Sequence, residues 1–354
     1  MQRQNAFLNL NKQFSNQKTK TNMSNLTKKI NIVGIGGVSK ILANFPKNQN
    51  LFALDTNSKN LESLPNFIQK IQFGNGDGSG GNLEFAANLF DPNLVESIFD
   101  CDLLILIAGL GGGTGSGITP IISKIAKKKL ILTKIIAFSP LNFEGSKAKS
   151  NQVLENFKNL DLPITLIDNQ AILEKMSKET DFSEFWRIAN FGANESIKAV
   201  KSIIESQNID YEDLKKVFDY GGFCYTNSGI GTDFDKAFSN LENSTTLDEN
   251  SFKTAKGFLL NFKIGKNGMN LEQLDKIQNF IKFVQSSTNA NLKTSQETTE
   301  NEEFEITVLV SGIGTQTKID ENYSKIIQDK FEFEQKKYLS QIRSESAKQN
   351  LSKK

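Results

Sequence analysis

The fold of this chain is decided by the stretch Asp102-Leu103-Leu104-Ile105-Leu106-Ile107-Ala108-Gly109-Leu110-Gly111-Gly112-Gly113-Thr114-Gly115-Ser116-Gly117. Its apolar run, 103–108, predicts a strand that is buried on both faces. Five glycines follow within seven residues, and 118–129 predicts a helix with one apolar stripe. Glycine lets backbone N–H groups crowd an anion, and a helix N-terminus adds its dipole. We therefore expect a phosphate site here, whose ligands are Gly111, Gly112, Gly113, Thr114, Gly115 and Ser116.

Two other strand-to-helix turns are also rich in glycine. The first follows the strand 29–33 and reads Gly34-Ile35-Gly36-Gly37-Val38-Ser39; the second spans 74–82. Parallel sheets gather such turns at the carboxyl ends of their strands, so three turns can cradle three phosphates. The expected ligands in these two turns are Gly36, Gly37, Gly80, Gly81 and Asn82.

The first turn also resembles a dinucleotide-binding fingerprint. Asp55 ends the strand 51–55, about twenty residues after the glycines, where an acid would meet a ribose hydroxyl. Against an NAD site, Ser39 stands where the third glycine belongs, and the 111–117 loop has no place in that fingerprint. We therefore disfavour a nicotinamide cofactor.

Composition excludes several classes of function. The 354 residues carry a net charge of +2, no histidine and two cysteines far apart. Catalysis by a histidine base is excluded, the two distant cysteines disfavour a disulfide framework, and the charge gives no argument for nucleic acid. No apolar stretch reaches the ~20 residues that span a bilayer, so we expect no direct membrane insertion.

The pattern of elements predicts an α/β fold: a parallel sheet, a long central helix, and a second, smaller α+β domain. The polar stretch 286–303 is expected to be an exposed loop. The predicted segments are a basic tail (1–29), a nucleotide-binding α/β domain (30–181), a central helix (182–207), a C-terminal domain (208–314) and a polar tail (315–354).

From about residue 29 to 314 the chain resembles the tubulin/FtsZ family of GTPases, and within it the FtsZ-type division proteins. Three motifs carry the resemblance: Gly111 to Gly117, Asn142-Phe143-Glu144-Gly145, and the N-x-D-x-x-D pattern of Asn208, Asp210 and Asp213. In addition, 53–57 stands at the family's second phosphate loop.

The resemblance assigns further residues. Glu144 would meet the ribose, Asn169 and Asn194 would read the base, and Phe191 would pack on it. The first glycine loop departs from the family pattern at Val38-Ser39-Lys40-Ile41, and we expect Lys40 to supply a charge there in compensation.

For Asn208, Asp210 and Asp213 the resemblance implies a loop that completes the active site of the next subunit. A simpler interpretation also stands: Asn208 or Asp210 caps the helix that begins here, and the acids favour its first turn.

The function implied by the resemblance is that of a GTPase that polymerises head to tail into a cytokinetic ring. GTP or GDP would be bound with Mg²⁺, and no residue of the chain is assigned as a metal ligand. The chain itself and membrane-tethering division proteins are the implied partners, and the implied location is cytoplasmic, at the division site. The alternative is an FtsZ-like structural filament protein with weak nucleotide turnover, which the altered first loop favours.

Overall fold

The computed structural model describes residues 28–141, 146–206, 208–244, 253–288 and 290–314. Most of the predicted N-terminal tail, the residue Glu144 and the predicted C-terminal tail lie outside these described residues. Lys28 and Lys29, the end of the predicted tail, form ion pairs with Asp102 and Asp100 beside the start of the buried strand. None of the described helices is long and apolar enough to span a membrane.

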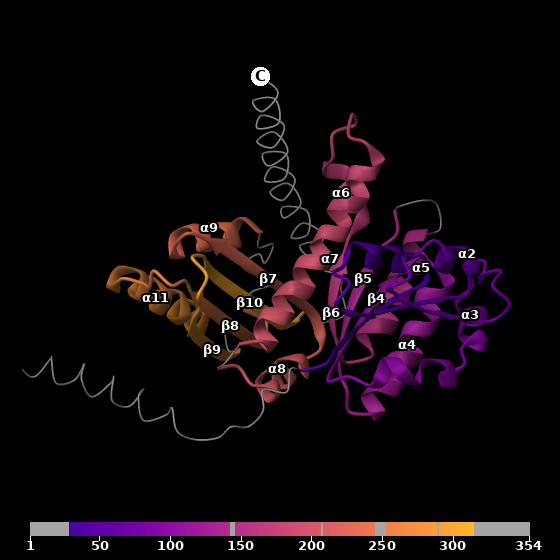
Figure 1. Ribbon diagram of the computed structural model, residues 1–354, viewed down its shortest axis with the longest axis horizontal. Coiled ribbons are helices and arrows are strands. Elements are labelled where there is room, and N and C mark those ends of the chain that lie inside the picture. Colours follow the sequence, from indigo (N-terminus) through magenta and orange to yellow (C-terminus); the bar gives the residue numbers. More distant parts are fainter. Residues whose placement is uncertain (1–27, 142–145, 207, 245–252, 289, 315–354) are drawn as a thin grey trace, which may run out of the picture.

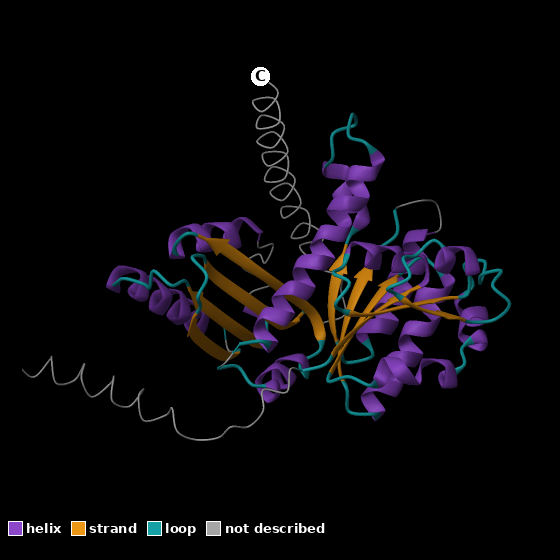
Figure 2. Ribbon diagram, viewed as in Figure 1, coloured by secondary structure: helices purple, strands orange, loops and turns teal. Residues whose placement is uncertain are grey.

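Within the described residues, one ten-stranded sheet runs through both halves of the chain (Figures 1 and 2). Its strand order is β3-β2-β1-β4-β5-β6-β7-β10-β8-β9. Neighbours from β3 to β6 are parallel, whereas β10 pairs antiparallel with both β7 and β8. The parallel and antiparallel parts meet where β6 pairs with β7 over two residue pairs. The strands are β1 (Ile30–Ile35), β2 (Asn50–Asp55), β3 (Gln69–Gln72), β4 (Leu103–Gly109), β5 (Leu132–Phe138), β6 (Pro163–Ile167), β7 (Gly222–Gly231), β8 (Gly257–Ile264), β9 (Asn291–Thr298) and β10 (Phe304–Ile313).

The predicted buried strand is β4, and it lies at the centre of the parallel part. Every residue from Leu103 to Ala108 is fully buried, as its continuous apolar run indicates. Helices connect successive strands along the chain. They are η1 (Gly36–Asn44), α2 (Ser58–Glu62), α3 (Leu83–Leu89), η2 (Pro92–Phe99), α4 (Gly113–Lys128), α5 (Ser146–Lys158), α6 (Asn169–Lys175), α7 (Phe182–Ile204), α8 (Tyr211–Phe218), α9 (Phe234–Ser244) and α11 (Leu271–Ser287). The predicted α/β class with a parallel sheet and a long central helix is confirmed.

The central helix α7 runs between the parallel and the antiparallel parts of the sheet (Figure 1). Its 23 residues make it about 35 Å long at ~1.5 Å per residue. Figure 2 shows the arrowheads of the parallel strands near α7 pointing toward the end of the molecule where α7 begins. The helix α8 follows α7 and lies at the opposite end (Figure 1). The two ends of α7 therefore mark the two ends of the parallel strands.

The predicted loop over 286–303 is wrong in its centre, where β9 forms an eight-residue strand. Its sequence, NLKTSQET, has one apolar residue and gives no alternating pattern by which a strand is recognised. β9 is a strand because it pairs along its whole length with β8, whose own core-facing residues are apolar. Tertiary pairing has outweighed local sequence preference at this edge.

Candidate functional site

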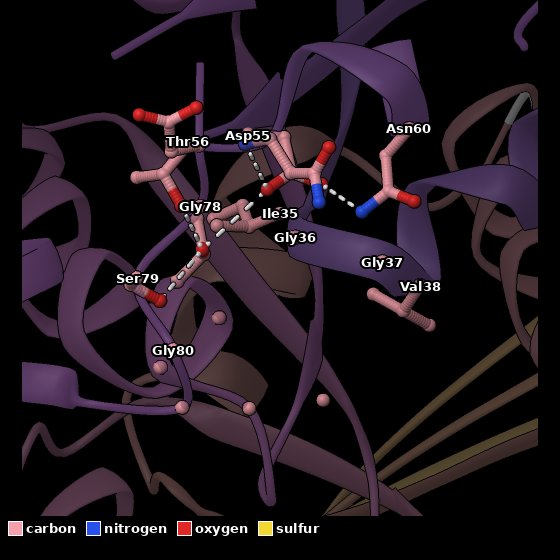
Figure 3. Close-up of a pocket in the computed structure, with 18 residues that line it drawn as sticks. Ile35, Gly36, Gly37, Val38, Asp55, Thr56, Asn60, Gly78, Ser79 and Gly80 are labelled. Carbon is pink, nitrogen blue, oxygen red and sulfur yellow. Dashed lines mark hydrogen bonds between the residues drawn. The ribbon is translucent and has the colours of Figure 1, made fainter. Parts of the chain in front are cut away.

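A cavity of about 440 Å³ opens at the carboxyl ends of β1, β2 and β4 (Figure 3). The three glycine turns meet here, as the parallel topology predicts. Its lining residues are Ile35, Gly36, Gly37, Val38, Asp55, Thr56, Asn57, Asn60, Asp77, Gly78, Ser79, Gly80, Gly81, Gly109, Gly112, Gly113, Thr114 and Gly115.

The helix α4 begins inside the glycine stretch, at Gly113, five residues earlier than the apolar stripe indicates. Gly112 is its N-cap and has no side chain that could satisfy the first N–H groups. The first four N–H groups of any α-helix lack partners within the helix. In α4 these belong to Gly112, Gly113, Thr114 and Gly115, and all four residues line the cavity. Backbone donors at the positive end of a helix dipole are suited to bind an anion, and whether they hold a phosphate stays a prediction.

The Thr114 hydroxyl connects the start of α4 to the end of β2 and to the 74–82 turn. Its Oγ1 lies 2.8 Å from the Thr56 hydroxyl, 3.4 Å from the Ser79 hydroxyl and 3.5 Å from the carboxylate of Asp55 (Figure 3). The other Asp55 oxygen accepts a hydrogen bond of 2.9 Å from the Asn60 amide. Asp55 therefore holds the loop in shape, in a place where the dinucleotide interpretation expected a ribose contact.

Gly113 needs to be glycine for a reason that the sequence does not give. From the sequence one expects a Cβ at this position to block the approach of a phosphate. In the structure that Cβ would instead lie 2.3 Å from the Ser79 hydroxyl and 2.7 Å from the Asn82 carbonyl oxygen. A larger residue at Gly113 would therefore push apart α4 and the third glycine turn before any ligand is involved.

Seven of the predicted ligands that the structure describes do not line the cavity, and two of them are Phe191 and Asn194 on α7. Lys40 is exposed on η1, and the side chain of Asn82 caps α3 by accepting from the Phe85 N–H. The Ser116 hydroxyl donates to the Leu110 carbonyl oxygen at 3.1 Å, so it serves the turn rather than the cavity. The other two are Gly111, against which Pro140 packs, and Asn169.

The residues assigned to the base lie on α6 and α7. Phe191 and Asn194 are half-buried on α7. Asn169 is buried at the first position of α6, and its side-chain oxygen has no hydrogen-bond partner in the described part of the chain. An unpaired buried acceptor costs free energy that a bound donor could recover. Whether these three side chains meet a base stays a prediction.

The cavity also contains residues to which sequence reasoning gave no role. Asp77, Ser79 and Asn60 line it. Asp77 and Ser79 could have been found from their place in the turn that follows β3, and Asn60 from its place in α2, the helix that follows β2. Lys149, on α5, donates a hydrogen bond from its ammonium to the carbonyl oxygen of Gly81. Lys149 thus brings a cation to the edge of a lining that itself contains no lysine or arginine.

The segment containing Asn208, Asp210 and Asp213 has a different environment. Asp210 is the N-cap of α8, and its carboxylate accepts from the Asp213 N–H at 2.8 Å, while the Asp213 carboxylate accepts from the Asp210 N–H at 3.3 Å. The capping interpretation is therefore confirmed for Asp210. The Asn208 side chain instead donates to the Gln296 carbonyl oxygen of β9, at 2.7 Å.

Asp213 also forms an ion pair, 2.8 Å from the ammonium of Lys293 on β9. Burial by itself raises the pKa of Asp213. Hydrogen bonds from Lys293 and from the Asp210 N–H, together with the charges of Lys293 and Lys216, outweigh that effect and hold the pKa below its ordinary value. Asp213 is therefore a carboxylate at neutral pH.

The cavity and the acidic segment lie at opposite ends of β4. The Tyr211 hydroxyl, in the first turn of α8, donates to the carbonyl oxygen of Asp102, which directly precedes β4. Gly109, the last residue of β4, lines the cavity. At about 3.3 Å per residue, the chain from Asp102 to Gly109 spans roughly 23 Å. Asp210 and Asp213 therefore cannot reach a ligand in the cavity of their own chain.

This chain resembles known proteins in sequence. A sequence profile described as "Tubulin/FtsZ family, GTPase domain" matches residues 5–177. A relative called cell division protein FtsZ, from Buchnera aphidicola subsp. Baizongia pistaciae, is 30% identical over 316 residues, which cover 83% of this chain and 81% of the relative. The chain belongs to the tubulin/FtsZ family. Aquifex aeolicus contributes another relative with the same name, 29% identical over 66% of this chain and 68% of its own.

Solved structures of the tubulin/FtsZ fold agree with the architecture. An empty FtsZ dimer of M. jannaschii superposes with a TM-score of 0.67 at 20% identity, covering 88% of this chain and 94% of that one. A GTPγS-bound protofilament of CetZ2 from Haloferax volcanii gives 0.66 at 19% identity, covering 88% and 99%. At these identities the structures support the shared fold and nothing finer.

Proposed function

We propose that this chain binds GTP in the cavity and hydrolyses it in head-to-tail filaments, as a division protein that forms a cytokinetic ring. The observation that supports this most strongly is the separation along β4: the cavity lies at one end and the acidic pair at the other. In a head-to-tail stack, the acid-bearing end of one subunit meets the cavity of the next. Such a contact does not close on itself, so it produces filaments. The relatives' name and the fold of filament-forming neighbours support the same assignment.

Hydrolysis in this arrangement needs little covalent chemistry from the protein. A water oxygen attacks the γ-phosphorus, the bond from γ-phosphorus to the bridging oxygen breaks, and GDP leaves with the electron pair. Both protons of the water end on the released phosphate, as H₂PO₄⁻. The free N–H groups of residues 112–115 would hold the phosphates, and Asp213 of the adjoining subunit would orient the water.

Mg²⁺ would accompany the nucleotide, and the residues present fit it. Asp77 lines the cavity. One of its carboxylate oxygens, Oδ2, accepts from the Asn75 amide, while Oδ1 has no hydrogen bond among the described residues. Mg²⁺ is commonly held by one or two carboxylates and by phosphate oxygens. When bound, the ion would neutralise charge on the phosphates.

Turnover should depend on assembly. If the site is completed by a neighbour, phosphate release per subunit should rise steeply as the protein concentration crosses the threshold at which filaments pellet. Phosphate release and sedimentation, measured over the same dilution series, test this. Turnover per subunit that stays constant across the threshold would mean that each chain carries a complete site.

A second candidate function is a structural filament that binds nucleotide weakly and hydrolyses it slowly. It is favoured by the exposed position of Lys40, outside the cavity lining, and by the ion pair that already occupies Asp213. The dilution series separates the two candidates, because this one predicts filaments with little phosphate release at any concentration. In either case we propose that other proteins attach the filament to the membrane.

Lys149 should contribute to nucleotide affinity, because its ammonium already lies at the Gly81 carbonyl on the rim of an otherwise uncharged donor set. We expect Lys149→Ala to weaken binding of a labelled GTP analogue by roughly tenfold, or about 1.4 kcal/mol, and to reduce its salt dependence. Lys40→Ala is the comparison, a lysine near the same loops that makes no hydrogen bond to a lining residue in the described part of the chain. Equal losses in the two variants would contradict a specific role for Lys149.

A further inference from the structure

The acidic segment is attached to the edge strand β9 by three side-chain contacts. The Ser206 hydroxyl lies 3.2 Å from that of Ser295, the Asn208 amide donates to the Gln296 carbonyl, and Asp213 is paired with Lys293. β9 ends the sheet, with β8 as its neighbour on one side only. The segment and the edge strand therefore form one surface at the acid-bearing end of the molecule.

Within the Asp213–Lys293 pair, the cation is the more accessible partner. The side chain of Lys293 is 43% exposed and that of Asp213 only 13%. An ammonium has three donors, and the described contacts of Lys293 use one of them, on Asp213. A group that approaches this surface from outside would meet the ammonium before it meets the carboxylate.

This arrangement answers a difficulty in the proposed function. A surface that brings Asp210 and Asp213 to a triphosphate sets negative charge against negative charge, and like charges across an interface cost several kcal/mol. Two lysines lie near the acids in sequence. Lys215 pairs with Glu212 on the same helix. Lys216 acts on Asp213 by its charge, without a direct ion pair among the described residues. Lys293 comes from a strand eighty residues further along the chain and is held at the carboxylate itself.

We propose that Lys293 is the cation of the interfacial active site: it holds the Asp213 carboxylate in position and offers its free donors to the terminal phosphate of the nucleotide on the adjoining subunit. This inference rests on the proposed function, because it assumes that Asp213 acts on a neighbour's nucleotide. The inference adds Lys293 to that site, and with it the strand β9 on which Lys293 lies. The ammonium lowers the repulsion at docking and stabilises the charge that develops on the phosphate oxygens.

Lys293→Met tests the proposal, since it keeps the length of the side chain and removes the charge. Nucleotide affinity of the unassembled subunit should match wild type, because the cavity lies at the other end of β4. Phosphate release per assembled subunit should fall by roughly a hundredfold or more, the range for losing one donor aimed at developing charge. Lys293→Arg should restore most of it. Lys276→Met is the control, because Lys276 also pairs with surface acids, Asp235 and Glu272, away from this segment.

A pH profile distinguishes this role from a purely structural one. The charged groups acting on Asp213 are Lys293 and Lys216, while Asp210 acts on Asp213 through its backbone N–H and on Lys293 by its charge. Without Lys293 the pKa of Asp213 rises, so the acid limb of the turnover profile should move to higher pH. In Lys293→Arg the limb should stay where it is in wild type.

The outcomes with Asp213→Ala and Lys293→Met distinguish a failure of the proposed function from a failure of the role proposed for Lys293. If Asp213→Ala abolishes turnover while Lys293→Met retains it, or leaves the acid limb unmoved, the role of Lys293 is wrong and the proposed function stands. If Asp213→Ala itself retains turnover, the proposed function fails. The Lys293→Met protein could also bind GTP and keep the wild-type melting temperature but fail to pellet at any concentration. That result would make Lys293 a docking residue only and would overturn the proposal.

Discussion

Asp213→Ala is expected to lower phosphate release per assembled subunit at least about a hundredfold, the range for losing a group that orients or activates a reacting water. GTP affinity should be unchanged, because the acid and the cavity are separated by the length of β4. Filaments should persist longer than those of wild type, since the GDP state is reached slowly. Turnover, nucleotide binding and the lifetime of pelleted polymer are the three measurements.

The structure adds a control for this experiment. Asp213 is also the third residue of the capping box of α8, so its loss should destabilise that helix by about 1 kcal/mol. The helix α11 has the same device, in which Gln273 accepts from the Asn270 N–H. Gln273→Ala removes a matching cap interaction away from the acidic segment and should turn over GTP like wild type. A similar loss of activity in both variants would assign the Asp213 effect to helix stability.

The meeting of the glycine turns at one cavity was predictable from the sequence because it depends on the backbone. The buried run of β4 and the glycines after it determine a strand, a turn and a helix start, and parallel topology brings the other turns to the same edge. The contacts that each side chain makes could not be predicted. Thr114 and Ser116 look alike in the sequence, yet Thr114 connects α4 to the end of β2 and to the 74–82 turn, and Ser116 bonds to the Leu110 carbonyl.

The surroundings of the acidic pair were missed for a different reason. Asp210 and Asp213 stand out in the sequence because of their spacing, but Lys293 lies in a polar stretch that we expected to be an exposed loop. That stretch is a strand only because β8 pairs with it. A contact between α8 and an edge strand depends on the whole C-terminal half being folded, and no local pattern encodes it. The cation beside Asp213 therefore became visible only in the structure.

Gly112→Val is expected to reduce GTP affinity at least about a hundredfold while leaving the fold intact. Gly112 has extended backbone angles, φ −85° and ψ 162°, which valine adopts readily. A Cβ here would meet no protein atom within 4 Å, although the residue lines the cavity and carries one of the free N–H groups of α4. The added side chain would occupy space where a phosphate must approach these donors. Isothermal titration with a slowly hydrolysed GTP analogue gives the affinity, and thermal melting without nucleotide tests the fold.

Gly113→Val is the comparison variant for Gly112→Val. Its Cβ would collide with Ser79 and Asn82, so it should lose both binding and thermal stability, whereas Gly112→Val should lose binding alone. Wild-type affinity in a folded Gly112→Val protein would show that the phosphates bind elsewhere. Because Gly112→Val retains Asp213, mixing it with Asp213→Ala should restore phosphate release. In the mixed filament, Asp213 of the Gly112→Val subunit acts on the nucleotide bound by the Asp213→Ala subunit. Neither protein can complete such a site alone. An inactive mixture in which both proteins pellet together would argue against an active site shared between subunits.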